Sequence, residues 1–171
     1  MSQGEAVSVG IVVERRRTGN PWQPEAWRAV DVLPGLPEAA PWTPLGRGEG
    51  WERFYAGPAE IELYAGETAA YRDNLEGSRP AVYVVLRRGA GEPGIAVHLA
   101  TVDPGEAEAH SEVGDDQVEA VPLPRPIAGW MADFVARHHV ERPFYKRRRE
   151  PADPEALARR ALVPEPGGHD D

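Results

Sequence analysis

Frequent interruption by glycine and proline is the feature that most constrains the fold of this protein. Its 171 residues include 18 glycines and 18 prolines, so more than a fifth of the positions resist regular structure. Such a composition excludes a coiled coil, a long helical bundle and a collagen-like protein. We therefore expect several short strands and a few short helices joined by turns.

Two further absences narrow the class of protein. The sequence has no cysteine, which excludes a disulfide framework, a thiolate zinc site, an iron–sulfur cluster and a cysteine nucleophile. No apolar run approaches the roughly 20 residues that span a bilayer, and the N-terminus lacks the basic and apolar blocks of a signal peptide. We expect a cytoplasmic protein without a membrane partner.

The charge of the protein is strongly acidic. Acidic residues number 28 and basic residues 19, which gives a net charge of −9. Lys146 is the single lysine, and the other basic residues are all arginine. Because nucleic-acid binding depends on clustered positive charge, we do not expect a nucleic-acid partner.

The first half of the sequence predicts strands and one long loop. Residues 7–13 are apolar and β-branched, and we expect them to pair with residues 27–33 after a turn at 18–21. In the second strand, side chains at alternate positions share a face, so one face is predicted to hold Trp27, Ala29, Asp31 and Leu33. Residues 34–50 hold four prolines and four glycines and predict a loop, pinned by Trp42 and Leu45.

The second half of the sequence predicts strands and helices, and the spacing of its apolar residues changes from that of a strand to that of a helix after residue 64. Residues 51–55 and 59–64 predict two antiparallel strands that flank a short connection at 56–58, with Ile61 and Leu63 pointing inward. The remaining predicted elements are a helix at 67–76, a hairpin of 81–86 with 95–102, a helix at 104–112, an edge strand at 118–121 and a helix at 124–140.

The last predicted helix carries an apolar stripe for packing on a sheet. Its members are Ile127, Trp130, Met131, Phe134, Val135 and His138. Together these elements predict an α+β fold, a small, mainly antiparallel curved sheet or half-open barrel with a short mid-chain helix and a C-terminal amphipathic helix. We expect one domain over residues 1–149 and a disordered, proline-rich charged tail over 150–171.

One candidate binding patch combines arginine and tryptophan. Its members are Arg15, Arg16, Arg17, Asn20, Trp22, Trp27 and Arg28. Arginine forks bind carboxylate or phosphate, and a neighbouring tryptophan can stack on a planar group. The alternative is a solvated strand end whose arginines pair with surface carboxylates.

A second candidate is the polar stripe of the predicted helix at 67–76. Glu67, Tyr71 and Asn74 follow one another at i, i+4 and i+7, so they could line a polar pocket or contact a partner. The alternative is that Tyr71 and Leu75 pack on the sheet while Glu67 serves the helix N-terminus.

Other polar groups favour solvated surfaces over metal sites. Glu106 and His110 share a helix face, but their acidic segment at 103–119 is more typical of a solvated face that could receive a basic partner. His138 and His139 are adjacent and point in different directions. The basic run at 146–149 fits either a loose grip on an acidic molecule or a solvated boundary. We expect no metal and no cofactor.

The common catalytic sequence templates are also absent. The sequence has no Gly-x-Ser-x-Gly elbow, no phosphate-binding Gly-x-x-x-x-Gly-Lys loop, no Gly-x-Gly-x-x-Gly after a strand and no His-Glu-x-x-His. No catalytic residue can be assigned on these grounds, and we expect a protein that is not an enzyme.

Several stretches are similar to those of an uncharacterised bacterial family. They are VGIVVERR at 9–16, NPW at 20–22, WR at 27–28, VLPG at 32–35, ETxxYxxNLE at 67–76, PAVYVVLR at 80–87 and the close from Trp130 through HHV at 138–140 to PF at 143–144. On these stretches the protein resembles the domain-of-unknown-function family numbered 3305, found mainly in proteobacteria. The resemblance extends over about residues 8–149.

The resemblance implies a genetic context and no established activity. Genes of this family tend to lie beside those of molybdenum-dependent formate dehydrogenases and their assembly factors. This implies a non-catalytic accessory protein that binds a formate dehydrogenase subunit or assembly factor and supports maturation or assembly of the enzyme. The alternative is a binding domain or enzyme of molybdenum cofactor metabolism, which would take a pterin, a nucleotide or another anion.

Some similar proteins carry the name of a molybdopterin guanine-dinucleotide transferase. Such a transferase opens with a strand and a glycine-rich nucleotide loop that contains arginine and lysine. Here residues 15–20 follow the first strand with one glycine and no lysine, which argues against that activity.

Overall fold

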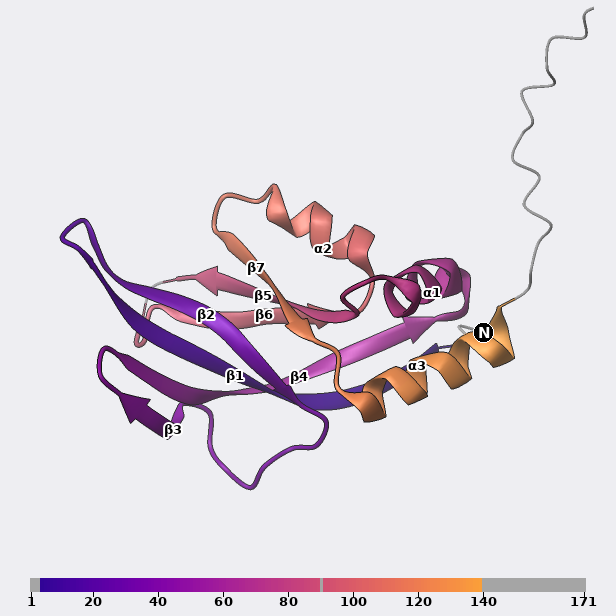
Figure 1. Ribbon diagram of the computed structural model, residues 1–171, viewed down its shortest axis with the longest axis horizontal. Helices are drawn as coiled ribbons and strands as arrows, with labels where there is room; N and C mark the ends of the chain where they lie inside the picture. Colours follow the sequence, from indigo (N-terminus) through magenta and orange to yellow (C-terminus); the bar gives the residue numbers. More distant parts are fainter. Residues whose placement is uncertain (1–3, 90, 140–171) are drawn as a thin grey trace, which may run out of the picture. The chain divides into compact units, whose positions relative to one another are not determined.

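The first antiparallel sheet is built around one long strand. β1 (Gly4–Asn20) pairs with β2 (Gln23–Leu33) on one side and with β4 (Trp51–Tyr64) on the other. β3 (Thr43–Gly48) adds to the outer side of β4, so the strand order is β2-β1-β4-β3 (Figure 1). The computed structural model describes residues 4–89 and 91–139.

The second sheet has three strands. β5 (Ala81–Arg88) is central, with β6 (Ile95–Thr101) on one side and β7 (Asp116–Pro122) on the other. β4 approaches β6, and β2 approaches β7, without a ladder that joins the two sheets in the described part of the protein. The sheets therefore face each other and do not close into a barrel.

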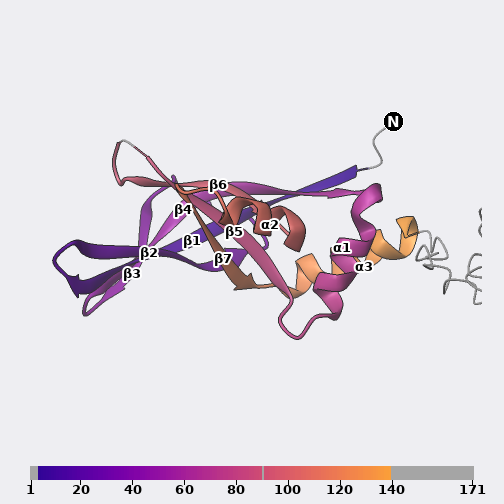
Figure 2. The ribbon, with the colours of Figure 1, turned by 90° about the horizontal axis from the view of Figure 1, so that it is seen from above.

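Short helices lie at one end and on one face of the sheets. A 3-10 turn (Ala65–Glu67) leads from β4 into α1 (Thr68–Glu76), which packs beside α3 (Arg125–His138) beyond one end of the sheets (Figure 2). α2 (Pro104–Ser111) packs on the second sheet against β5 and β7. Among the described residues, none of the helices has the length and apolar character needed to cross a bilayer.

One apolar core joins both sheets and α3. Val9, Ile11 and Val13 from β1 are fully buried together with Val82 and Val84 from β5. The predicted stripe of α3 contributes its buried members Ile127, Met131 and Phe134. The Phe134 ring centroid lies 6.2 Å from that of Tyr71 on α1.

The predicted α+β class is confirmed, as are the antiparallel pairing of the first two strands and the hairpin of β5 with β6. The helix at 67–76, the edge position of β7 and the inward Ile61 and Leu63 also agree with the structure. The difference is that the strands divide between two sheets. The predicted tail and the basic run at 146–149 lie outside the described residues.

The predicted connection at 56–58 is wrong, because β4 runs straight through it. Ile11 pairs with Gly57 and Val12 with Tyr55, so Ala56 has no partner and forms a β-bulge. Gly57 has φ 124°, a conformation that only glycine adopts without strain. A glycine and a proline inside a strand therefore mark a bulge here rather than a turn.

The predicted faces of residues 30–33 are wrong for the same reason. Val12 pairs with Asp31 and Val13 with Ala29, which leaves Val30 as the extra residue of a bulge. Trp27 and Ala29 share a face as predicted, but beyond the bulge Val32 is buried and Asp31 is exposed.

Two boundaries in this half also differ from the prediction. The segment at 34–50 contains β3. Leu45 is 52% exposed, so its side chain does not anchor this segment to the core as predicted. Trp42 does pack inward, with its ring centroid 5.7 Å from that of Trp27. β1 continues to Asn20, and the turn consists of Pro21 and Trp22 rather than residues 18–21.

Candidate functional site

A charged cavity lies at the far end of the first sheet. The β1–β2 and β3–β4 hairpins extend past the second sheet at the end away from α1 and α3 (Figure 2). A cavity of about 390 Å³ opens there, which we call the arginine cavity. Its lining residues are Arg15, Arg17, Glu25, Arg47, Gly48, Gly50, Trp51 and Glu52.

Arg15 is held in place at the inner end of the arginine cavity. Its guanidinium group donates to Glu52 at 3.0 Å and lies 4.0 Å from Glu25. The same group lies 5.6 Å from the ring centroid of Trp27 and 5.4 Å from that of Phe54. Arg15 therefore covers the aromatic end of the core, and its charge is already compensated.

Arg17 and Arg47 leave the arginine cavity with uncompensated positive charge. In the described part of the protein, neither guanidinium group has a hydrogen-bond or ion-pair partner. Both side chains lie on neighbouring hairpins, because Arg17 belongs to β1 and Arg47 to β3. Guanidinium groups bind carboxylates and phosphates through paired N–H donors, so this arrangement suits an anionic group.

Arg16 belongs to the opposite face of the sheet. Its Nε donates to Glu14 at 3.0 Å, and Nε of Arg53 donates to the second oxygen of the same carboxylate at 3.0 Å. Glu14 is only 4% exposed. Burial raises the pKa of Glu14, but the hydrogen bonds from Arg53 and Arg16 outweigh it and hold the pKa below its usual value.

The predicted arginine and tryptophan patch is thus divided. Arg15 and Arg17 line the arginine cavity, whereas Arg16 and Arg28 are exposed and do not line it. Trp22 is 94% exposed on the β1–β2 turn, where its backbone N–H donates to Asn20 at 2.9 Å. Trp27 packs on the core as part of an aromatic cluster.

Sequence reasoning missed six members of the arginine cavity. Arg47, Gly48 and Gly50 lie in a segment that was expected to be a loop, and Glu25, Trp51 and Glu52 were not singled out. A signal did exist, since alternation along an extended β1 separates Arg15 and Arg17 from Arg16. That argument requires a strand that continues beyond residue 13.

The polar stripe of α1 serves mainly the interior. Glu67 is exposed at the start of the helix, whereas Tyr71 and Asn74 are 2% and 5% exposed. The Tyr71 hydroxyl accepts a hydrogen bond from the backbone N–H of Tyr64 at 2.9 Å, and burial raises its pKa. Asn74 bonds to the backbone of Ala81 and Val102. The packing alternative describes Tyr71 better than a polar pocket does.

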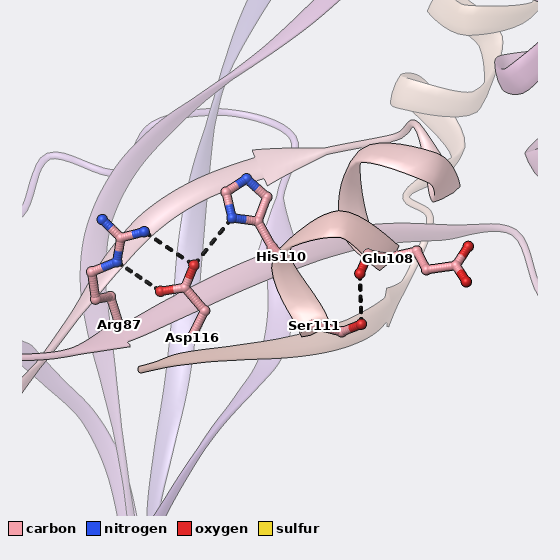
Figure 3. A network of polar contacts seen from close by, with 5 residues as sticks. All are labelled: Arg87, Glu108, His110, Ser111 and Asp116. Atoms are coloured by element: carbon pink, nitrogen blue, oxygen red, sulfur yellow. Dashed lines mark hydrogen bonds and ion pairs between the residues drawn. The ribbon is translucent and has the colours of Figure 1, made fainter. Parts of the chain in front are cut away.

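A second polar cluster, which sequence reasoning did not predict, lies on the second sheet. Asp116 on β7 accepts two hydrogen bonds from Arg87 on β5, at 2.7 and 3.0 Å, and contacts Nδ1 of His110 at 3.1 Å (Figure 3). The hydrogen bonds from Arg87 lower the pKa of Asp116 to about 2, against the opposing effect of burial, with a further contribution from His110.

His98 on β6 completes this group. Its ring centroid lies 5.5 Å from that of His110, and one ligand atom each of His98, His110 and Asp116 lies within 4.8 Å of the others. We call these three residues the histidine cluster. Glu106, which shares the helix face of His110, accepts a hydrogen bond from Thr101 instead. Of the predicted acidic face, His110 and Asp116 are therefore engaged in a defined network.

Comparison with protein families decides the relationship of the protein. A family model described as a protein of unknown function, DUF3305, matches residues 8–148. The protein belongs to the DUF3305 family. The match covers nearly all of β1 to α3, so both the arginine cavity and the histidine cluster lie within the DUF3305 region. Neither the curated proteins nor the solved structures give a match.

Proposed function

We propose that this DUF3305 protein is a non-catalytic accessory protein that binds a protein partner and supports maturation or assembly of a molybdenum-containing formate dehydrogenase. The partner would be a subunit of that enzyme or one of its assembly factors. The choice of enzyme comes from the gene neighbourhood implied by the family resemblance. The choice of a binding role comes from the arginine cavity.

The observation that carries the binding role is the pair of uncompensated guanidinium groups, Arg17 and Arg47, in a cavity of about 390 Å³. An acidic side chain of a partner, or the partner's C-terminal carboxylate, would supply the negative charge that these groups lack. Glu25 and Glu52 in the same wall disfavour a ligand with many phosphates, because they would repel it.

The serine beside His110 does not turn the histidine cluster into a serine-based catalytic relay. Ser111 follows His110 in the sequence, but its hydroxyl donates to the backbone oxygen of Glu108 at 2.7 Å (Figure 3). Within residues 4–89 and 91–139 no serine is bonded to His110, so a Ser-His-Asp relay is not assembled there.

Co-purification from native cells tests this proposal. We expect the tagged protein to recover formate dehydrogenase subunits or their assembly factors, and the double variant Arg17→Ala/Arg47→Ala to lose most of that recovery. The matched control is Arg88→Ala/Arg125→Ala, which removes two exposed arginines elsewhere. Deletion of the gene should lower formate dehydrogenase activity, and unchanged activity would count against the proposal.

One observation favours a second candidate, a small-anion binding domain of molybdenum cofactor metabolism. The arginine cavity is large enough for a small planar anion, and Trp51 lies in its wall. A thermal-shift screen with a pterin, nucleotides and formate separates the two candidates. Saturable stabilisation that disappears in Arg17→Ala/Arg47→Ala would support the anion site, whereas no stabilisation together with partner recovery supports the accessory protein.

A further inference from the structure

We propose that His98, His110 and Asp116 form a binding site for a divalent transition-metal ion such as Zn²⁺. This proposal goes beyond the accessory role and does not depend on it. The site lies on the second sheet, whereas the arginine cavity lies at the end of the first. It rests on how the elements place the three side chains, on the chemistry of their ligand atoms and on the support that Arg87 gives.

Three different elements bring the ligands together. His110 lies in the last turn of α2, and Asp116 begins β7 after the short turn that follows this helix. His98 comes from β6, and one ligand atom from each residue lies within 4.8 Å of the other two. Three protein ligands that converge on one point are the number found in open zinc sites.

A β-bulge sets the position of His98. Val85 pairs with Leu99 and Leu86 with Val97, which leaves His98 as the extra residue between them. Bulges change the direction of a side chain and are enriched beside functional sites. The ring of His98 is thereby placed 5.5 Å from that of His110, centroid to centroid. Because His98 is exposed, its imidazole ring can rotate to close the remaining distance to an ion.

The contact between His110 and Asp116 already has the spacing of two metal ligands. Nδ1 of His110 lies 3.1 Å from Oδ2 of Asp116. Two ligand atoms bound to tetrahedral zinc at about 2.0–2.1 Å lie roughly 3.3 Å apart. Binding of one ion to both atoms therefore requires them to separate by only a few tenths of an ångström.

Arg87 can keep its hydrogen bonds to Asp116 while Asp116 binds an ion. Its Nε donates to Oδ1 of Asp116 at 2.7 Å and a second nitrogen donates to Oδ2 at 3.0 Å. A carboxylate has about four acceptor positions, so two remain beside the bonds from Arg87, and an ion can take the one that His110 now contacts. The Asp116 side chain is fully buried, and Arg87 fixes its orientation as outer partners do in metal sites.

The ligand atoms select the class of metal. Two imidazole nitrogens and one carboxylate oxygen suit Zn²⁺, Co²⁺, Ni²⁺ or Cu²⁺, whereas Mg²⁺ and Ca²⁺ prefer sets made of oxygen alone. The side chain of His110 is 22% exposed, and His98 is more exposed, so water can reach the remaining coordination positions. We therefore expect an open site with three protein ligands.

Titration of the untagged full-length protein with Zn²⁺ and with Co²⁺ tests the proposal. Calorimetry should give one ion per protein molecule, and Co²⁺ should add the visible absorption bands of a nitrogen- and oxygen-ligated ion. His98→Ala and His110→Ala should each weaken binding by at least tenfold. The matched control, His138→Ala, removes a histidine of α3 outside the cluster and should bind as the original protein does.

The exposed position of His98 keeps this test independent of folding. His98→Ala should leave the far-UV circular dichroism spectrum and the thermal midpoint of the metal-free protein unchanged, so a loss of binding reports on the site. Failure of the original protein to bind Zn²⁺ more tightly than His98→Ala would overturn the proposal. Equal weakening by His138→Ala would also overturn it, because the ion would then bind at scattered surface histidines.

Discussion

Asn74 provides the sharpest test of how the helices are attached to the sheets. Its side-chain nitrogen donates to the carbonyl oxygens of Ala81 and Val102 at 2.8 and 2.9 Å, and its oxygen accepts from the N–H of Ala81 at 3.0 Å. These bonds join α1 to the start of β5 and to the residue after β6. Asn74 is 5% exposed, so water cannot replace the lost partners freely.

The Asn74→Ala variant should lose about 3 kcal/mol of the free energy of unfolding. Each of the three bonds contributes a net value of about 1 kcal/mol, and backbone groups left without a hydrogen-bond partner add a further penalty where water does not reach them. For a domain of this size that loss corresponds to a fall in the thermal midpoint of roughly 10 °C. Asn74→Asp should lose more at neutral pH, because a carboxylate would face two carbonyl oxygens.

Urea unfolding followed by circular dichroism and tryptophan fluorescence measures this loss. The matched control is Asp73→Asn, an exposed neighbour on the same helix, which should stay within about 0.5 kcal/mol of the original protein. A loss below about 1 kcal/mol in Asn74→Ala would refute the reasoning. If that variant instead kept its stability and lost a partner, Asn74 would be the binding residue that the sequence pattern suggested.

Three further predictions concern the core, the β4 bulge and the buried carboxylate. Phe134→Ala should lower the free energy of unfolding by about 3–5 kcal/mol, measured by thermal unfolding, because the ring is fully buried. The control is Ala132→Ser at an exposed position of the same helix, and an equally small loss in both variants would contradict the prediction. Gly57→Ala should lower the free energy of unfolding by about 1–3 kcal/mol, because Gly57 has a positive φ. Gly46→Ala should lower it less, because an added Cβ at Gly46 meets no atom within 4 Å. The native Glu14 carboxylate has a pKa below its unfolded value of 4.5. Its stabilising effect is therefore complete above pH 4.5 and is lost as the pH falls through the native pKa. Urea midpoints of the original protein and Glu14→Gln should converge in acid, and a difference that is constant with pH speaks against this.

Much of the fold follows from the sequence because periodicity is a local property. The stripe that includes Ile127, Met131 and Phe134 predicts the helix α3 and its buried face, with a C-terminal end placed beyond His138, where α3 stops. The apolar run at residues 81–86 predicts the buried strand β5. These predictions succeed because burial of one face determines the pattern without reference to distant residues.

Bulges account for most of what the sequence did not predict. The extra residues are Val30 in β2, Ala56 in β4 and His98 in β6. Each moves the residues beyond it to the other face, and the choice of the extra residue depends on the partner strand. The candidate sites are difficult to predict for the same reason. The residues of the arginine cavity come together only in the register of four strands, and those of the histidine cluster only because of the bulge at His98.

The hairpin ends that carry the arginine cavity extend beyond the second sheet. Most side chains there are exposed, in contrast to the buried middle of β1. Replacing them removes little apolar contact, so the fold tolerates change at these positions far better than at Ile11 or Val84. Natural variation can therefore alter the charge and shape of this end of the molecule while the protein still folds, and such a change need not be accompanied by compensating changes in the core.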